Sequence, residues 1–282
     1  MNVKIVTDTT ADISAEVAQA LGVTIVPGYV HFGKEVFRDG VDISNEAFYR
    51  KLIASPFHPT TSAPTPEDFV RVYSDCSQEV EGIISIHVSS KISDTYNSAM
   101  KARKKVKGKC QVEVVDSRFV SVGLSLVVME AAKLANAGES IPDICEKINE
   151  DISRICMLVV LDTMKYAGLG KRVVKLTASL ARRLDIKPLL VFKNGEIMQE
   201  SLVHTNSYPR IIDRLCDFVW ERAAIQELAI AHSAVPEQAE ELKKRLVSVL
   251  PEERIHIAQI GSAIGVHSGP GALVIALRQG TA

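Results

Sequence analysis

The first part of the chain alternates between two hydrophobic periods. Short runs rich in β-branched residues predict strands, and segments with apolar positions three or four residues apart predict helices between them. The predicted strands are 3–8, 24–32, 82–89 and 110–117, and the predicted helices are 12–21, 44–54, 66–79 and 93–107. Longer helices are expected at 120–137 and 140–155. Strands that alternate with helices indicate a parallel sheet with crossover helices.

The pattern changes after residue 155. A strand at 156–162 and a helix at 172–185 are followed by two apolar runs around Asn194-Gly195, a strong hairpin signal. Further helices are predicted at 208–224 and 236–249, and further strands at 227–233, 254–261 and 271–277. We therefore predict an α/β fold in two domains. Residues 1–155 form a mostly parallel-sheet domain, and residues 156–282 form a mixed-sheet α/β domain.

Composition narrows the function classes. The 282 residues carry a formal charge of -1, so no overall field favours nucleic acid or anionic lipid, and one tryptophan argues against base stacking. The five cysteines never form a CxxC pair, so neither a disulfide framework nor a zinc site is indicated. The start lacks a signal peptide, and no run approaches the roughly 18 apolar residues of a transmembrane helix. A cytoplasmic protein is expected.

Common catalytic motifs are missing from the sequence. There is no GxxxxGK[ST] or GxGxxG phosphate cradle, no GxSxG elbow and no HExxH pair. Kinase activity within this chain is therefore not expected. A small-molecule hydrolase that uses Ser93 and His267 stays as the alternative function.

Hydroxyl groups are concentrated at two predicted turns. The segment SSKISDTYNSA, residues 89–99, follows a strand and opens a helix, where unpaired amides favour an anion. Ser93 as a helix cap explains part of this pattern, but not the density of hydroxyls. Asp94 would repel a phosphate, so a single carboxylate or a neutral polar group is the better guest. The segment PTTSAPTPEDF, residues 59–69, likewise carries more hydroxyls than one cap needs.

Three further features have both a structural and a functional interpretation. His267 lies in a glycine-rich turn that either lines a site or only reverses the chain. Arg172 stands at a predicted helix start, where it either meets an anion or points to solvent. The segment KARKKVKGK, residues 101–109, either complements the dipole at a helix end or docks an acidic partner or membrane surface.

The chain resembles the DegV family, bacterial fatty-acid-binding proteins, over nearly its whole length. The motifs that carry the resemblance occur in the family's order: IVTDTTADI, PTTSAPTPEDF, SSKISDTYNSA, VVDS, YAGLGKRV, IKPLLVFKNGEI and HSGPGALV. The resemblance implies that the C-terminal domain buries an acyl tail and that the domain interface holds the carboxylate. It also implies a carrier without turnover, cofactor or metal, which presents a long-chain, palmitate-like fatty acid to a separate kinase subunit for phospholipid synthesis.

The family's functional residues carry over by motif. Thr61 and Ser93 match the residues expected to bond the carboxylate, and Arg172 and His267 match supporting residues at the head-group. His204 stands where many members carry an arginine after the hairpin, and Asp94 where the family usually has glycine. A kinase subunit is expected to dock on the basic patch, which comprises Lys101, Arg103, Lys104 and Lys105. A lipid-binding regulator that has no kinase partner is the third hypothesis.

Overall fold

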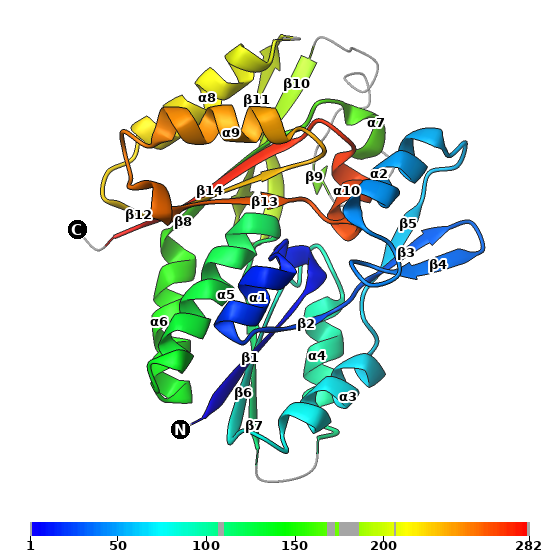
Figure 1. Cartoon of the computed structure of the whole chain (residues 1–282), viewed down its shortest axis with the longest axis vertical. Helices are drawn as coiled ribbons and strands as arrows, with labels where there is room; N and C mark the ends of the chain where they lie inside the picture. Colours follow the sequence, from blue (N-terminus) through cyan, green and yellow to red (C-terminus); the bar gives the residue numbers. More distant parts are fainter. Residues whose placement is uncertain (1, 107–109, 168–172, 175–185, 206, 281–282) are drawn as a thin grey trace.

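The computed structural model describes residues 2–106, 110–167, 173–174, 186–205 and 207–280. Its parallel sheet comes from the first part of the chain, and the order of its described strands is β2-β1-β6-β7. These strands are β1 (Val3–Asp8), β2 (Thr24–Val26), β6 (Gly82–His87) and β7 (Gln111–Asp116). All pairings in this sheet are parallel. The predicted alternation of strands and helices is confirmed (Figure 1).

Helices cover both faces of this sheet. They are α1 (Ala15–Leu21), α3 (Pro66–Cys76), α4 (Thr95–Arg103), α5 (Ser121–Asn136) and α6 (Ile141–Arg154). The predicted start of α3 is confirmed: Thr65 caps the helix, and its side chain and that of Asp68 form a capping box. The start predicted at residue 12 is wrong. Residues Thr9–Ala11 form a 3₁₀ turn, and Ser14 caps α1.

The second sheet is mixed, as predicted, with strand order β13-β12-β14-β8-β10-β11-β9. Its strands are β8 (Ile155–Val160), β9 (Val173–Val174), β10 (Ile186–Lys193), β11 (Glu196–His204), β12 (Ile225–His232), β13 (Ile255–Gln259) and β14 (Leu273–Gln279). The hairpin predicted at Asn194-Gly195 joins β10 to β11. Helices α8 (Tyr208–Trp220) and α9 (Pro236–Leu246) cover one face, and a short 3₁₀ turn, Glu252–Arg254, precedes β13. The helix predicted at 172–185 is wrong at Val173–Val174, which form β9, and the other residues of that prediction lie outside the described ones.

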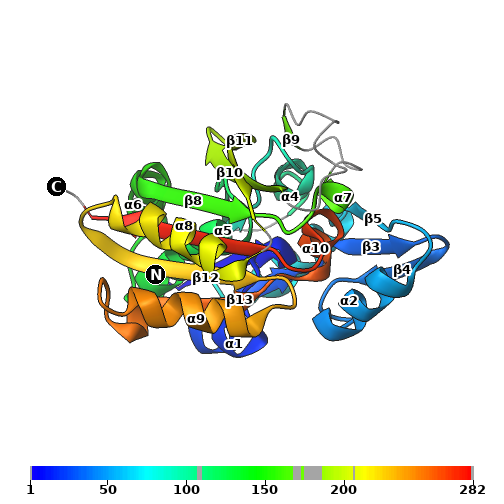
Figure 2. The same ribbon diagram turned by 90° about the horizontal axis from the view of Figure 1, so that it is seen from above.

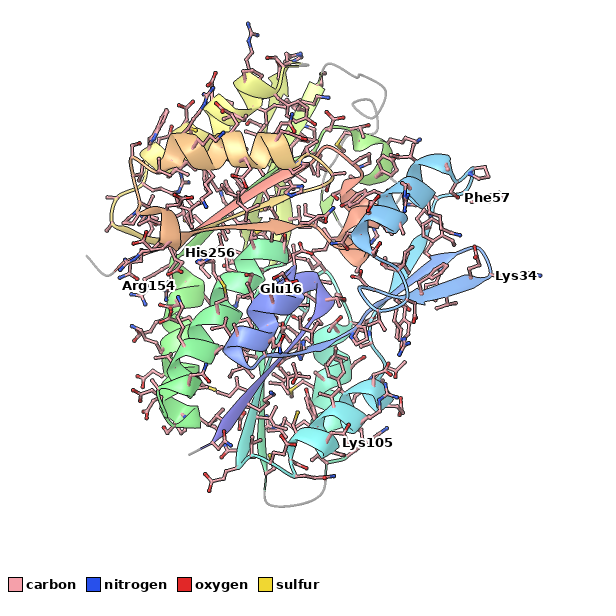
Figure 3. All side chains as sticks on the ribbon, in the orientation of Figure 1. Glu16, Lys34, Phe57, Lys105, Arg154 and His256 are labelled. Carbon is pink, nitrogen blue, oxygen red and sulfur yellow. The ribbon has the colours of Figure 1, made fainter. Side chains whose placement is uncertain are left out.

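A small antiparallel sheet projects from the side of the molecule (Figures 1 and 2). It contains β3 (Tyr29–Phe32), β4 (Glu35–Arg38) and β5 (Thr60–Ser62), with helix α2 (Asn45–Ala54) packed beside it. The single strand predicted over 24–32 is therefore wrong. It breaks at Pro27-Gly28, because proline has no amide for a strand ladder, and its two halves enter different sheets. Lys34 and Phe57 lie at the outer end of this unit (Figure 3).

One apolar core connects the two large sheets. It contains Ile5 and Ile84 of the parallel sheet, Val274 of the mixed sheet, and most of α5 between them. Arg278 on β14 also forms ion pairs with Asp151 on α6 and Glu130 on α5. The domain boundary at residue 155 stays a prediction. Across the described ranges, no helix is both long and apolar enough to cross a membrane.

Candidate functional site

A mostly apolar cavity lies where the two large sheets and the small sheet meet. Its walls come from the segments that follow β1 and β6, from β5, from helix α10 (Ser262–Ser268), and from one face of the mixed sheet. The mixed-sheet wall consists of alternate residues, because successive side chains of a strand point to opposite faces. On β8, Met157 and Val159 line the cavity, whereas Leu158 and Val160 belong to the core on the opposite face. The strand pattern thus builds an apolar compartment.

Polar side chains gather at the end of the cavity beside α10. They include Thr61, Ser62, Ser93, Thr95, His267 and Ser268, and Asp8, Thr10 and Ser121 also line the cavity. Thr61 Oγ1 lies 3.1 Å from His267 Nε2, within hydrogen-bond distance. The structure therefore brings together three of the predicted site residues, Thr61, Ser93 and His267, around one apolar space. The turn expected at His267 is wrong, since this residue belongs to the last turn of α10.

Ser93 has a different local role from the one predicted. Helix α4 begins at Thr95 with Asp94 at the cap position, so Ser93 is not the helix cap. Instead, Ser93 Oγ accepts from the Thr95 amide and lies 2.9 Å from Thr95 Oγ1. One of the two hydroxyl protons serves the bond between these side chains, and the other is available to donate into the cavity. The pair is suited to a carboxylate or a carbonyl oxygen.

The other two predicted residues, Arg172 and His204, differ in what the structure describes of them. Arg172 lies outside the described residues. His204 is exposed at the end of β11, where it pairs with Ile186, and among the described residues it does not line the cavity. Asp94, which stands between the lining residues Ser93 and Thr95, does not itself line the cavity. Asp94 is exposed and lines an open groove on the outer side of α4.

Comparison with known proteins assigns the family. The DegV family model, which describes a family of uncharacterised proteins, matches residues 2–279. The chain belongs to the DegV family. It is 31% identical to a DegV domain-containing protein from Deinococcus radiodurans over 98% of each chain.

Solved DegV structures share the whole fold. A structure of a DegV family protein from Thermus thermophilus, described by its fatty-acid binding, superposes with a TM-score of 0.89 at 27% identity and covers 99% of this chain and 100% of its own. DegV from Bacillus subtilis, described as a fatty acid binding protein, gives a TM-score of 0.87 at 27% identity, with the same coverage. The family and the fold class predicted from the sequence are confirmed.

In this DegV protein, buried carboxylates hold α10 in place. Asp39 accepts hydrogen bonds from the backbone amides of Ser262 and Ala263, at 3.0 and 3.1 Å, and from the Ser262 hydroxyl. Asp12 accepts from the Gly261 amide at 2.8 Å and lies 2.5 Å from Ser121 Oγ. Burial raises the pKa of Asp12 to about 8. Both residues belong to the first part of the chain, so they connect it to the helix that carries His267.

A hydrogen-bonded chain of buried side chains lies below the cavity. Asp8, at the end of β1, lines the cavity and lies 2.9 Å from His87 Nδ1, and His87 Nε2 lies 2.6 Å from Ser85 Oγ. Tyr73 donates to the same Ser85 oxygen, and burial raises the pKa of Tyr73. The order resembles a serine hydrolase triad, but Ser85 has no exposed surface, so a substrate cannot reach its hydroxyl. The chain instead fixes the position of Asp8.

Sequence reasoning missed both carboxylate networks. The available signal for the Asp8 network was on β6, where Ser85 and His87 are two polar positions on the same face of an otherwise apolar strand. No comparable signal points to Asp39. In the part of the chain that the structure describes, no group of three or more His, Cys, Asp or Glu side chains is arranged to hold a metal ion.

The basic patch divides into two kinds of residue. Arg103 pairs with Glu113 and Lys105 pairs with Glu67, so these charges are compensated; Figure 3 shows Lys105 beyond the end of α4. Lys101 and Lys104 line the open groove and form no ion pair with any described residue. Residues 63 and 64 line both the groove and the cavity. The uncompensated lysines therefore lie in a groove that adjoins the cavity.

Proposed function

We propose that this protein binds a long-chain fatty acid, with the carboxylate at Thr61 and Ser93 and the acyl tail in the apolar compartment. The observation that carries the proposal is the cavity itself, whose wall along the mixed sheet is apolar and whose polar lining residues include Thr61, Ser93 and His267. The fatty-acid binding described for the related proteins from T. thermophilus and B. subtilis supports the same ligand class.

The tail supplies most of the affinity in this proposal. Burial of about 14 methylenes at ~0.8 kcal/mol each contributes on the order of 10 kcal/mol before the entropy lost on binding. Each hydroxyl contact to the carboxylate contributes about 1.5 to 3 kcal/mol at best. The polar end thus orients the ligand, and the tail determines most of the affinity.

Hydroxyl donors at the polar end suit an anionic oxygen. When His267 Nε2 donates to Thr61 Oγ1, the Thr61 proton is left to donate to the ligand. The Ser93 and Thr95 pair supplies a second donor in the same way. Arg172 stays a proposed supporting residue at the head-group. His204 also stays a proposed head-group residue, and its exposed position favours a weak contribution to binding.

We further propose that the protein is a cytoplasmic carrier that presents the fatty acid to a kinase subunit for acyl-phosphate formation, without turnover of its own. The groove beside the cavity supports a docking role, because Lys101 and Lys104 form no ion pair with any described residue, outnumber the one acidic lining residue, Asp94, and favour an acidic partner surface. Transient contact with an anionic membrane surface is the other use of the same charges.

Native mass spectrometry followed by lipid extraction tests fatty-acid binding. The wild-type protein is expected to retain a fatty acid, and the Thr61→Ala/Ser93→Ala variant is expected to lose most of it. Thr60→Ala is the matched control, because Thr60 is the exposed neighbour of Thr61 on β5 and does not line the cavity. A wild-type protein that is empty and takes up no added fatty acid would contradict the proposal.

The hydrolase alternative receives less support from the geometry. A nucleophilic serine needs a hydrogen bond to its base, but Ser93 bonds Thr95, and His267 bonds Thr61. An ester-hydrolysis assay distinguishes the two functions. Turnover that disappears in Ser93→Ala would support the hydrolase, whereas the carrier is expected to show none.

A further inference from the structure

Three apolar side chains form a row across the mixed sheet at one end of the cavity. Leu190 of β10 pairs with Val159 of β8. Because the two strands are antiparallel, Phe192, two residues further along β10, lies opposite Met157 of β8. On the other side of β10, Phe192 pairs with Ile197 of β11. All three line the cavity, and this row is defined here as the terminal row: Met157, Phe192 and Ile197.

The terminal row lies far from α10, the helix that carries His267. Leu161, which follows β8, and Ala167 of α7 (Met164–Ala167) both line the cavity, and α7 contacts α10. Strand rise places Met157 about 13 Å along the sheet from Leu161, and strand spacing places Ile197 about 10 Å to the side of β8. The diagonal is therefore about 16 Å, close to the ~15 Å that a lipid tail spans in half a bilayer.

Rigid elements support the terminal row from behind. A Cβ atom at Gly123 of α5 would lie 2.9 Å from Met157 Sδ, so the helix backbone is in close contact with Met157. The ring of Phe119 lies 6.0 Å from that of Phe192. These neighbours leave Met157 and Phe192 little freedom to move aside for a longer chain.

The tip of the hairpin is also held in place. Ser89 Oγ donates to the Gly195 carbonyl at 2.7 Å, and Lys91 forms an ion pair with Glu196 at 3.2 Å. These contacts join the tip of the β10–β11 hairpin to the loop after β6, on the other side of the cavity. The position of Ile197 is thus set by both the parallel sheet and the mixed sheet.

We infer that the terminal row limits the length of the acyl chain that the cavity accepts. This inference rests on the proposed fatty-acid binding and adds a specificity determinant to it. Among the described residues of β8, β10 and β11, these three are the lining positions farthest from α10. A methyl end that passes this row would meet the side chains of Phe119 and α5, which are already close-packed.

A competition experiment tests the inference. The delipidated protein is offered an equimolar mixture of straight-chain saturated fatty acids from about 12 to about 20 carbons, and the bound acids are extracted and quantified. Phe192→Ala is expected to raise the longest well-retained chain by about two to four carbons, because a phenyl group occupies the space of several methylenes. Ile197→Phe is expected to lower it. Phe218→Ala is the matched control, since Phe218 is buried in the core on the other face of the mixed sheet.

The outcomes separate this inference from the proposed function. The inference is supported if the wild-type protein shows an upper limit of chain length. Phe192→Ala must then raise this limit, Ile197→Phe must lower it, and Phe218→Ala must leave it unchanged. Fatty-acid binding with the same upper limit in both folded variants overturns it and leaves the proposed function intact. A wild-type protein that binds none of the acids overturns the proposed function, and the inference with it.

Discussion

Thr61 and His267 are 206 residues apart in the sequence, yet Thr61 Oγ1 and His267 Nε2 lie 3.1 Å apart at the polar end of the cavity. The first belongs to the small sheet and the second to the last turn of α10. This contact closes the polar end between two distant segments of the chain, and it makes the hydroxyl of Thr61 dependent on the imidazole.

His267→Ala is expected to weaken fatty-acid binding about threefold to tenfold, because loss of one neutral hydrogen bond typically changes free energy by about 0.5–1.5 kcal/mol. Titration of the delipidated protein with a fluorescent fatty acid measures the change. Thr60→Ala is the control, since that threonine is exposed and does not line the cavity. Equal losses in the two variants would contradict the assignment of His267 to the site.

Asp12 is expected to make stability decrease as the pH rises. Its pKa is raised to about 8 in the folded protein, against about 4 in an unfolded chain. Between these values the folded state binds one proton more than the unfolded state, so the free energy of unfolding falls by about 1.4 kcal/mol per pH unit from this group alone. Above the folded pKa this contribution levels off.

Urea denaturation at a series of pH values checks this expectation, with Asp12→Asn as the comparison. The asparagine amide can keep both contacts, to the Gly261 amide and to Ser121, but does not titrate. Between about pH 5 and about pH 8, the wild type is expected to lose stability relative to the variant, because only the wild type titrates. A difference that is constant across this range would show that Asp12 is ionised in the folded state.

His87→Ala is expected to destabilise the protein by about 2–4 kcal/mol. The substitution removes a buried hydrogen-bond partner from Asp8 and leaves the Ser85 hydroxyl without its acceptor. Ser85→Ala is expected to cost less, since Asp8 keeps its bond to His87 and the two buried groups that lose a partner are the Tyr73 hydroxyl and His87 Nε2 rather than a carboxylate. Thermal and urea unfolding measure both variants, and equal, near-zero losses would mean that the chain does not position Asp8.

Gly269→Ala is expected to destabilise the protein by more than about 2 kcal/mol. Gly269 ends α10 with a φ of +67°, and an added Cβ would lie 2.1 Å from the Tyr166 ring on α7. Gly22→Ala is a close control, because Gly22 has a φ of +69° and no atom within 4 Å of the added Cβ. It is expected to lose only about 1 kcal/mol. Similar losses in calorimetry would rule out the clash with Tyr166 as the main cause.

Lys101→Glu/Lys104→Glu is expected to weaken binding to a fatty acid kinase subunit by at least tenfold and to leave fatty-acid retention unchanged. Reversal of two uncompensated charges opposes an acidic partner, and neither side chain lines the cavity. Surface plasmon resonance at low and moderate salt measures the interaction. Arg103→Gln is the control, because Arg103 already pairs with Glu113. Unchanged affinity in the double variant would place the docking surface elsewhere.

Local sequence signals determined the larger elements of this protein. Hydrophobic periodicity located both major sheets and most helices, Thr65-Pro66 marked the start of α3, and Asn194-Gly195 marked the β10–β11 hairpin. Such features depend on residues a few positions apart, so they are readable without the fold. The ordered motifs also identified the DegV family, and through it the candidate residues Thr61, Ser93 and His267.

Only the tertiary structure decided which of these elements meet. The break of 24–32 into two sheets, the anchoring of α10 by Asp39, and the row formed by Met157, Phe192 and Ile197 depend on strand order and register. Asp39 and Ser262 are 223 residues apart, and nothing in either local sequence specifies the other. Contacts between distant segments form because burial leaves polar groups no other partner and because packing admits few arrangements.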